Sequence, residues 1–572
     1  MATRKRSGSG SKRHLKEKVV QIYESFFRGE DLTTDNATFW DEFFLLKPKI
    51  PQLEAEIHKL SVEQLMSMKD SMNLLVSQCI EMLGQEHHIR LVYALQTLSA
   101  LLITMYQRAA QDSNINIKTV LIGSDNPDLK MQKLFEHCST ILSGDVPDSL
   151  KSMVLKLLLV IATGLDNIDE NPLVEYFMQN SLFESLIQLL CTSTERQHHG
   201  YDVVMLLMFL VNYKKQESAN PYVVKLSILD DELALNGYGQ VITAALNDYV
   251  MSTFGNMQGG GGGGGWLSSF TSMVGGIFMT SDETQPVIRG QRASGAEEGM
   301  LLALYEAAHL NRNFMTTLAH SSSAAASSAP PSPPATLPPH QTPPNLSQIQ
   351  ALDNEQPTNL LVTFFQYCSI VMADTRSESS INKCSLCFII LTCIVEEQFA
   401  NSIMHDQNLT FKVVNIFNVF ITFGDTFLPT PVSYDQLYYE LIRMHQVFDN
   451  LFYMALRYST SDGEFKAEAL RLANCLVNVR AIIQHFSPKI EAWLAMQNLS
   501  TPTEDQILEV VRKNYDSLIL KLQEGLESYE RYSEKEHRPL LSRLVLAARQ
   551  RSDASALHHH TAAALEHYTS IS

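Results

Sequence analysis

The chain has 572 residues, 45% of them hydrophobic and 19% charged, and a formal net charge of −18 at pH 7. This composition is ordinary for a soluble globular protein, and the acidic excess argues against binding of nucleic acid or anionic lipid over the whole surface. The length allows three or four domains of average size or one long stack of repeats.

Residues 1–14 form a basic arm, in which Arg4, Lys5 and Arg6 lie among serines and glycines. A solvated, disordered arm is the expected structure, with a nuclear signal or a contact to acidic lipid as the alternatives. No secretory signal peptide is expected, because no apolar segment follows the basic residues.

Residues 15–255 carry apolar side chains at helical spacing, which line one face of each predicted helix. Two such stripes are Leu91, Leu95, Leu98 and Leu102, and Leu150, Met153, Val154, Leu157, Leu158 and Ile161. The run Val203–Val211 (VVMLLMFLV) is apolar on nearly every side. A helix of this kind is covered on more than one side, so we expect an all-α solenoid of the armadillo or HEAT type.

Local signals mark the ends of these helices. Ser61 and Gln64 form a capping box that is expected to open a helix running to about Leu83. Pro147 marks another start, because proline suits the first helical turn. Four glycines lie where helices are expected to end: Gly84, Gly123, Gly144 and Gly164. No residue-level repeat is detectable, so the solenoid prediction depends on helix lengths and short connections.

Residues 256–293 are predicted to be a flexible linker, because Gly259–Gly265 cannot hold regular structure. An amphipathic segment, 266–279, follows the glycines. Its apolar stripe consists of Trp266, Phe270, Met273, Val274 and Ile277. The opposite face is uncharged and rich in serine, threonine and glycine, which is typical of helices that insert where lipid packing is loose. A helix that docks back onto the solenoid is the alternative.

Helical structure is expected again at 294–320, followed by a disordered Pro/Ser-rich linker at 321–352. A plain spacer is expected there, with SH3 docking or proline-directed phosphorylation as the alternatives. The second helical block is predicted over 353–534, and residues 535–572 are expected to be a partly disordered tail. One stripe in this block consists of Leu472, Leu476, Val479 and Ile483.

No run of residues reaches the ~20 apolar positions that a membrane span needs. The nearest, Val413–Phe423, is short and carries Asn415 and Asn418, so a buried helix is expected. A peripheral contact through the amphipathic segment is therefore the membrane hypothesis.

The usual signatures of catalysis are missing. The dinucleotide-binding fingerprint is incomplete at Gly237–Gly239, and no Walker A, HExxH, GxSxG or kinase motif occurs. The acidic cluster Asp230–Glu232 is expected to be solvated or to supply charge at a helix start, with binding of a cation as the alternative. We therefore predict a protein that is not an enzyme and that uses no cofactor.

The eight cysteines are expected to be reduced residues of a cytosolic protein, mostly inside helices. Cys384 and Cys387 form a CxxC near Cys393, but no second pair completes a zinc set. The histidines at His558–His560 are expected to be exposed in the tail. No metal site is predicted.

Six long segments carry a resemblance to a known family. They are Leu15–Val20, Ser149–Ile168, His199–Gly239, Leu301–Phe314, Phe423–His445 and Asp505–Glu534. On these segments, in order and through most of its length, the chain resembles the armadillo-like helical domain-containing protein 3 family, which is Golgi-associated. The terminal arms, the glycine run and the Pro-rich linker do not match closely. Family members also carry a long helical stretch between the positions matching Val413 and Asn415, and this chain lacks it.

The resemblance implies a non-catalytic scaffold in the cytosol and at the Golgi membrane, with no nucleic acid bound. It implies recruitment of phosphatidylinositol 4-kinase beta and of a large Arf guanine-nucleotide exchange factor, in support of Golgi structure and secretion. It also allows an Arf-like small GTPase as the membrane receptor. A solenoid cargo carrier of the nuclear-transport type and an enzyme without a recognisable motif are the alternative hypotheses.

Overall fold

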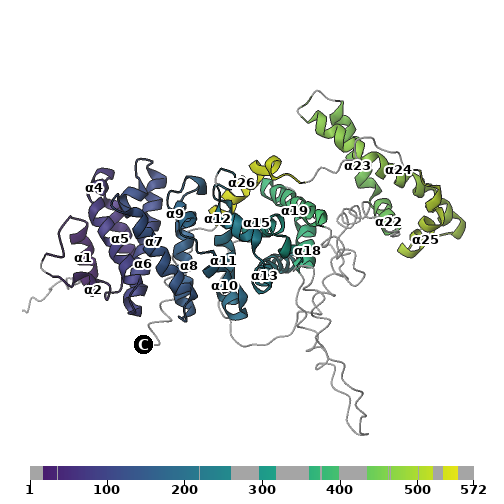
Figure 1. Cartoon of the computed structure of the whole chain (residues 1–572). Coiled ribbons are helices and arrows are strands. Elements are labelled where there is room, and N and C mark those ends of the chain that lie inside the picture. Colours follow the sequence, from purple (N-terminus) through teal and green to yellow (C-terminus); the bar gives the residue numbers. More distant parts are fainter. Residues whose placement is uncertain are drawn as a thin grey trace, which may run out of the picture. The chain divides into compact units, whose positions relative to one another are not determined.

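The structure, a computed structural model shown in Figure 1, describes residues 17–34, 36–217, 219–258, 296–316, 360–373, 377–397, 435–460, 463, 465–499, 502–519 and 532–551. Within these ranges the regular structure is helical and no strand occurs, which confirms the all-α prediction. The chain divides into two compact units. The first comprises Met1–Ala245, Asp282–Phe314 and Arg538–Ser572, and the second comprises Leu246–Ser281 and Met315–His537.

The first unit begins with short helices and continues with long ones. In chain order it contains α1 (Lys18–Phe26), α2 (Phe39–Phe43), α3 (Ile50–Lys59), α4 (Val62–Ser67), α5 (Lys69–Leu83), α6 (His88–Gln111), the π-helix η1 (Lys118–Ile122), α7 (Pro127–Ser143), α8 (Asp148–Thr163), the 3-10 helix η2 (Ile168–Glu170), α9 (Glu175–Gln179), α10 (Phe183–Cys191), α11 (Ser193–Asn212), α12 (Pro221–Ile228), the start of α13 (Glu232–Gln258), α15 (Ala296–Leu310) and most of α26 (Glu534–Arg551).

Consecutive helices of the first unit pack as pairs. Three pairs, α5–α6, α7–α8 and α10–α11, follow one another along the chain. The helices α6, α8, α11 and α15 contact one another in that order and form one layer, while α5, α7 and α10 form a second layer. Figure 1 shows these helices side by side in chain order, from purple to teal. Because each pair buries its apolar faces against the next, the unit is an armadillo-like solenoid, as predicted.

The apolar stripes of the sequence lie between these helices. Val203–Val211, in α11, is buried at every position. The predicted stripes of α6 and α8 are also buried at every position. The helix α11 contacts α8, α10, α12 and α15, so it is covered on several sides. This coverage explains why its sequence is apolar nearly all round.

The capping box at Ser61 is confirmed, but the length of its helix is not. Ser61 Oγ accepts a hydrogen bond from Gln64 N at 3.2 Å, and Ser61 N donates to Gln64 Oε1 at 2.8 Å. The helix then ends at Ser67, and α5 begins at Lys69. The N–H of Met68 is shared between the carbonyls three and four residues earlier, so the last turn tightens and interrupts the helix.

Glycines end helices where the sequence predicted. Gly84, Gly144 and Gly164 directly follow α5, α7 and α8, and Gly123 follows η1. Gly123 has φ +84°, and a Cβ added there would lie 1.6 Å from the amide oxygen of Asn73. That amide is fixed, because its nitrogen donates to Val120 O at 2.7 Å. Only glycine fits this position.

The helix α26 packs on the first unit, which the sequence did not indicate. Within the predicted partly disordered tail 535–572, the chain is helical as far as Arg551, and residues 552–572 lie outside the described ranges. Arg549 Nε donates to Thr163 O, after α8, at 2.8 Å, and its guanidinium pairs with Asp166. Arg538 donates to the side chain of Gln216, after α11, at 2.6 Å. These contacts to residues more than 300 positions away hold the helix.

The second unit contains a helix pair and a small bundle. In chain order its helices are the end of α13, α18 (Leu360–Ala373), α19 (Glu378–Glu396), α22 (Asp435–Arg443), α23 (His445–Ser459), α24 (Lys466–Gln497), α25 (Glu504–Asn514), the 3-10 helix η4 (Tyr515–Ser517) and the start of α26. The pair is α18–α19, and the bundle is α22–α25.

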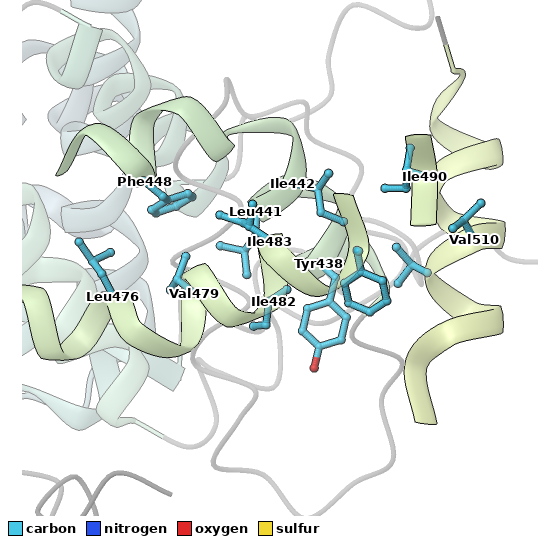
Figure 2. Packing of buried hydrophobic residues seen from close by; sticks show 12 residues of the cluster. Tyr438, Leu441, Ile442, Phe448, Leu476, Val479, Ile482, Ile483, Ile490 and Val510 are labelled. Atoms are coloured by element: carbon cyan, nitrogen blue, oxygen red, sulfur yellow. The ribbon is translucent and has the colours of Figure 1, made fainter. Parts of the chain in front are cut away.

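The bundle has one hydrophobic core, which Figure 2 shows. The helix α24 supplies Leu476, Val479, Ile482 and Ile483, which share one cluster with Leu441 and Ile442 of α22 and Phe448 of α23. Three residues of the predicted α24 stripe are therefore buried. Leu472 is 42% exposed, contrary to the prediction, because the shared core begins one turn later at Leu476.

Two described helices, α6 and α19, are long and apolar enough to span a membrane by length and composition. The helix α6 is mostly buried between α3, α5 and α8, as in the core of a soluble protein. The helix α19 contacts α18 and carries Lys383 near its start. Length and apolarity alone do not distinguish a core helix from a membrane-spanning helix. The peripheral membrane contact through the segment 266–279 therefore stays a prediction.

Candidate functional site

The predicted membrane-inserting residues lie outside the described residues, as does the whole segment 266–279. These residues are Trp266, Phe270, Met273, Val274 and Ile277. The basic arm 1–14, the glycine run, the Pro/Ser-rich linker 321–352, Val413–Phe423 and His558–His560 also lie outside. The proposals made for these segments stay predictions.

Within the first unit, a groove of about 360 Å³ lies between α10, α12 and the residues that lead into α13. Phe183 and Ile187 of α10 and Ile228 and Leu229 at the end of α12 supply its apolar lining. Its polar lining consists of Glu184, Gln188, Lys225, Asp230 and Asp231. The groove is therefore apolar with a mainly acidic margin.

The wall formed by α12 is held rigidly. Asn220 caps the helix, because its side-chain oxygen accepts from Tyr222 N at 2.8 Å. The amide nitrogen of Asn220 donates to Leu210 O at 2.8 Å and to Tyr213 O at 2.9 Å, which ties α12 to the end of α11. Tyr222 is fully buried, and its hydroxyl accepts from Leu182 N, just before α10, at 3.1 Å. The buried hydrogen bond of Tyr222 thus joins α12 to the start of α10, which forms the other wall of the groove.

Three exposed apolar side chains lie on the helices that border the groove. Val224 is 54% exposed and Ile228 is 69% exposed, and they lie one turn apart on α12. Leu233, at the start of α13, is 66% exposed. Exposed apolar side chains gathered beside a groove mark protein interaction sites more often than isolated ones do.

Charge at the groove is negative. Lys225 Nζ lies 2.7 Å from Glu184 Oε1 and 3.0 Å from Ser181 Oγ. Burial raises the pKa of Glu184, but the hydrogen bond from Lys225, a backbone hydrogen bond and the charge of Lys225 together outweigh it, so this pKa is lowered overall and the carboxylate is ionised at neutral pH. Asp230 and Asp231 then leave an acidic excess. A ligand that carries positive charge beside apolar groups complements this groove.

Asp231, in the acidic cluster, has one of the roles expected from the sequence. Asp231 Oδ1 accepts hydrogen bonds from Leu233 N at 2.9 Å and Ala234 N at 3.1 Å, so it caps the start of α13. Burial raises the pKa of Cys191, which lines the groove, and Asp231 raises it further. The raised pKa keeps the thiol protonated at neutral pH.

No pattern described for the sequence predicted this groove. The spacing of Val224 and Ile228 was the available signal, because two apolar residues one turn apart in a short helix beside Lys225 share a face. Which face becomes exposed depends on α10 and α15, and their positions follow from tertiary packing. Cys384 and Cys387, the CxxC pair, lie on α19 in the second unit and Cys387 is buried there.

The chain is similar in sequence to one family of known proteins. The family model for "Armadillo-like helical domain-containing protein 3, C-terminal" matches residues 383–552. The chain is 40% identical to the Armadillo-like helical domain-containing protein 3 of Danio rerio, 41% to that of Xenopus laevis and 39% to that of Homo sapiens. Each alignment covers 93% of this chain and 93% of the relative.

The alignments are longer than the aligned part of the chain. The alignment with the Danio rerio protein extends over 649 positions, whereas 93% of this chain is about 530 residues. More than a hundred positions of the alignment therefore have no counterpart in this chain. This difference is of the kind that the loss of a long internal stretch produces.

Proposed function

The chain belongs to the armadillo-like helical domain-containing protein 3 family, and from this premise we propose that it is a non-catalytic scaffold at the Golgi membrane. Its partners in this proposal are phosphatidylinositol 4-kinase beta and a large Arf guanine-nucleotide exchange factor, as its resemblance to the family implies. The scaffold would support Golgi structure and secretion by raising the local concentration of the kinase at its lipid substrate.

The observation that carries the scaffold proposal is the groove beside α12. A solenoid presents an extended surface, and a partner segment folds against such a surface as a helix in a groove. Val224 and Ile228 offer apolar contacts one turn apart, and Asp230 offers a negative charge beside them. The occupant that fits is an amphipathic helix of a recruited protein, with apolar residues flanked by lysine or arginine.

Binding of the purified kinase and exchange factor to the full chain tests this proposal. The double variant Val224→Glu/Ile228→Glu puts charge where the apolar contacts would lie, and we expect binding of one partner to weaken by more than about tenfold. Leu129→Glu is the matched control, because Leu129 is an equally exposed apolar residue on α7 of the same unit. Far-UV circular dichroism establishes that all variants remain folded.

The outcomes separate the two parts of the proposal. Failure of both partners to bind the parent chain overturns the recruitment proposal. The groove is not the docking site if the double variant and the Leu129 control weaken binding equally, or if neither of them weakens it.

Localisation in cells tests the Golgi proposal against its main alternative. A fluorescent fusion is expected at Golgi membranes, through the segment 266–279 or an Arf-like GTPase receptor. Accumulation at the nuclear envelope would instead favour the cargo carrier of nuclear-transport type.

A further inference from the structure

A cluster of three metal-ligating side chains lies in the first unit, apart from the groove lining. Asp148 is the first residue of α8, and Glu195 and His199 lie one turn apart near the start of α11. His199 Nε2 is 3.3 Å from Asp148 Oδ1 and 3.6 Å from Glu195 Oε2. The three ligand atoms all lie within 4.8 Å of one another. Two helices that pack together therefore bring one imidazole and two carboxylates to one point.

Neighbouring residues orient these side chains. His199 is fully buried, and its Nδ1 lies 3.2 Å from Ser152 Oγ, so its Nε2 is turned toward the carboxylates. Lys151 Nζ, also buried, lies 2.8 Å from Glu195 Oε1. The other carboxylate oxygen, Glu195 Oε2, is buried, and no donor among the described residues forms a hydrogen bond with it. Histidines and carboxylates that bind metals are commonly oriented in this way by hydrogen bonds to outer-shell residues.

The distances are compatible with a metal site. His199 Nε2 and Asp148 Oδ1 form a hydrogen bond of 3.3 Å, which is long for an N–H···O bond of ~2.7–3.2 Å, and the 3.6 Å between His199 Nε2 and Glu195 Oε2 exceeds that range. A tetrahedral zinc ion has bonds of ~2.0–2.2 Å to nitrogen and oxygen, which places its ligand atoms ~3.3–3.6 Å apart. The two separations from His199 Nε2 lie within that range.

Helix electrostatics explain only part of the cluster. Asp148 and Glu195 lie in the first turns of their helices, where negative side chains are stabilised by the helix dipole. That effect accounts for the presence of carboxylates at these positions. It does not account for a buried carboxylate oxygen without a donor that faces a fully buried imidazole.

We propose that Asp148, Glu195 and His199 bind a divalent transition-metal ion, with Zn²⁺ as the preferred ion, and that this ion joins α8 to α11. A nitrogen ligand and a small ligand set favour zinc over calcium or magnesium. Asp148 has a half-exposed side chain, so the ion can enter from solvent and keep water in its fourth position. His198 Nδ1, 3.3 Å from Asp148 Oδ2, lies beside this open position.

Titration of the chelator-treated full chain with Zn²⁺ tests the site by calorimetry and by the melting temperature. All proteins compared carry alanine at His558–His560, which removes the adjacent histidines of the tail. We expect one ion per chain and a melting temperature that rises with Zn²⁺ concentration. Glu195→Gln and His199→Gln should weaken binding by more than the ~100-fold that loss of an outer-shell contact costs.

Two further variants keep the test decisive. Asp148→Asn changes a half-exposed residue and is expected to fold normally while losing zinc affinity. Asp128→Asn, in the first turn of α7, is the matched control and should bind as the parent does. The proposal is overturned if the parent shows no saturable Zn²⁺ binding, if all variants bind equally, or if Ca²⁺ competes as effectively as Zn²⁺.

Discussion

The two helical units bury their helices to different degrees. In the first unit, α11 is covered by α8, α10, α12 and α15, and its run Val203–Val211 is buried throughout. In the second unit, α23 and α24 share a core on one side, while Tyr453, Met454 and Phe465 are exposed. A stack covers each helix on several sides, whereas a small bundle covers one face. An apolar residue at helical spacing is therefore more often buried in the first unit than in the second.

The largest effect is expected from truncating a core residue of the stack. Phe209, in α11, is fully buried, so Phe209→Ala should lower the free energy of unfolding by about 3–5 kcal/mol, through lost burial and a cavity. Phe465→Ala, in the second unit, should change it by less than about 0.5 kcal/mol because that side chain is exposed. Thermal unfolding followed by circular dichroism measures both. Equal losses of unfolding free energy from the two variants would contradict the expected difference in burial between these side chains.

Two leucines in one helix of the second unit sharpen the comparison. Leu476 is 7% exposed and Leu472, one turn earlier in α24, is 42% exposed. We expect Leu476→Ala to cost about 2 kcal/mol and Leu472→Ala less than half of that. Urea unfolding of the full chain compares the variants. A larger loss for Leu472 would mean that this face is covered in solution.

Alkaline pH is expected to destabilise the first unit. Burial raises the pKa of Tyr106, Tyr222 and Tyr238 well above 10.0. The folded unit keeps these phenols protonated, so stability is fully present below pH 10.0 and is lost as the pH rises above it, because only the unfolded chain ionises. Above pH 10.0, each of these tyrosines lowers the free energy of unfolding by about 1.4 kcal/mol for every unit by which the pH rises. Tyrosinate absorbance recorded together with circular dichroism should show ionisation of these tyrosines only on unfolding.

A pair of variants isolates this effect. Tyr238→Phe removes one buried phenol and should move the alkaline transition to higher pH. Tyr453→Phe changes an exposed tyrosine of the second unit and should leave the transition unchanged. Ionisation of all tyrosines before any loss of helix would contradict the prediction.

The smallest effect is expected at two helix starts, one in each unit. Ser61 forms a capping box with Gln64 in the first unit, and Thr503 forms one with Gln506 in the second. Ser61→Ala and Thr503→Ala should each cost about 1 kcal/mol, because a cap is a local interaction. Thermal unfolding measures both losses. Losses that differ by severalfold would show that packing around the two units governs even local caps.

Features that depend on near neighbours in sequence were predicted well. Residues within a few turns of one another determine three kinds of feature: the stripes of α6, α8 and α11, the capping box at Ser61, and the glycine after η1. Two predictions were wrong. The helix from Ser61 stops at Ser67, where the N–H of Met68 is shared between two carbonyls. Leu472 is exposed although its spacing matches buried residues, because the shared core begins at Leu476.

The sequence by itself determined the all-helical class, the paired-helix stack and the family, because helical periodicity and long segments of similarity are properties of contiguous residues. Only the tertiary structure decided where distant residues meet. Asp148 and Glu195 come together because α8 packs on α11. The groove forms because Tyr222 holds α12 beside α10. Such sites depend on contacts between residues 40 or more positions apart, and no local pattern specifies which faces of two helices will pack together.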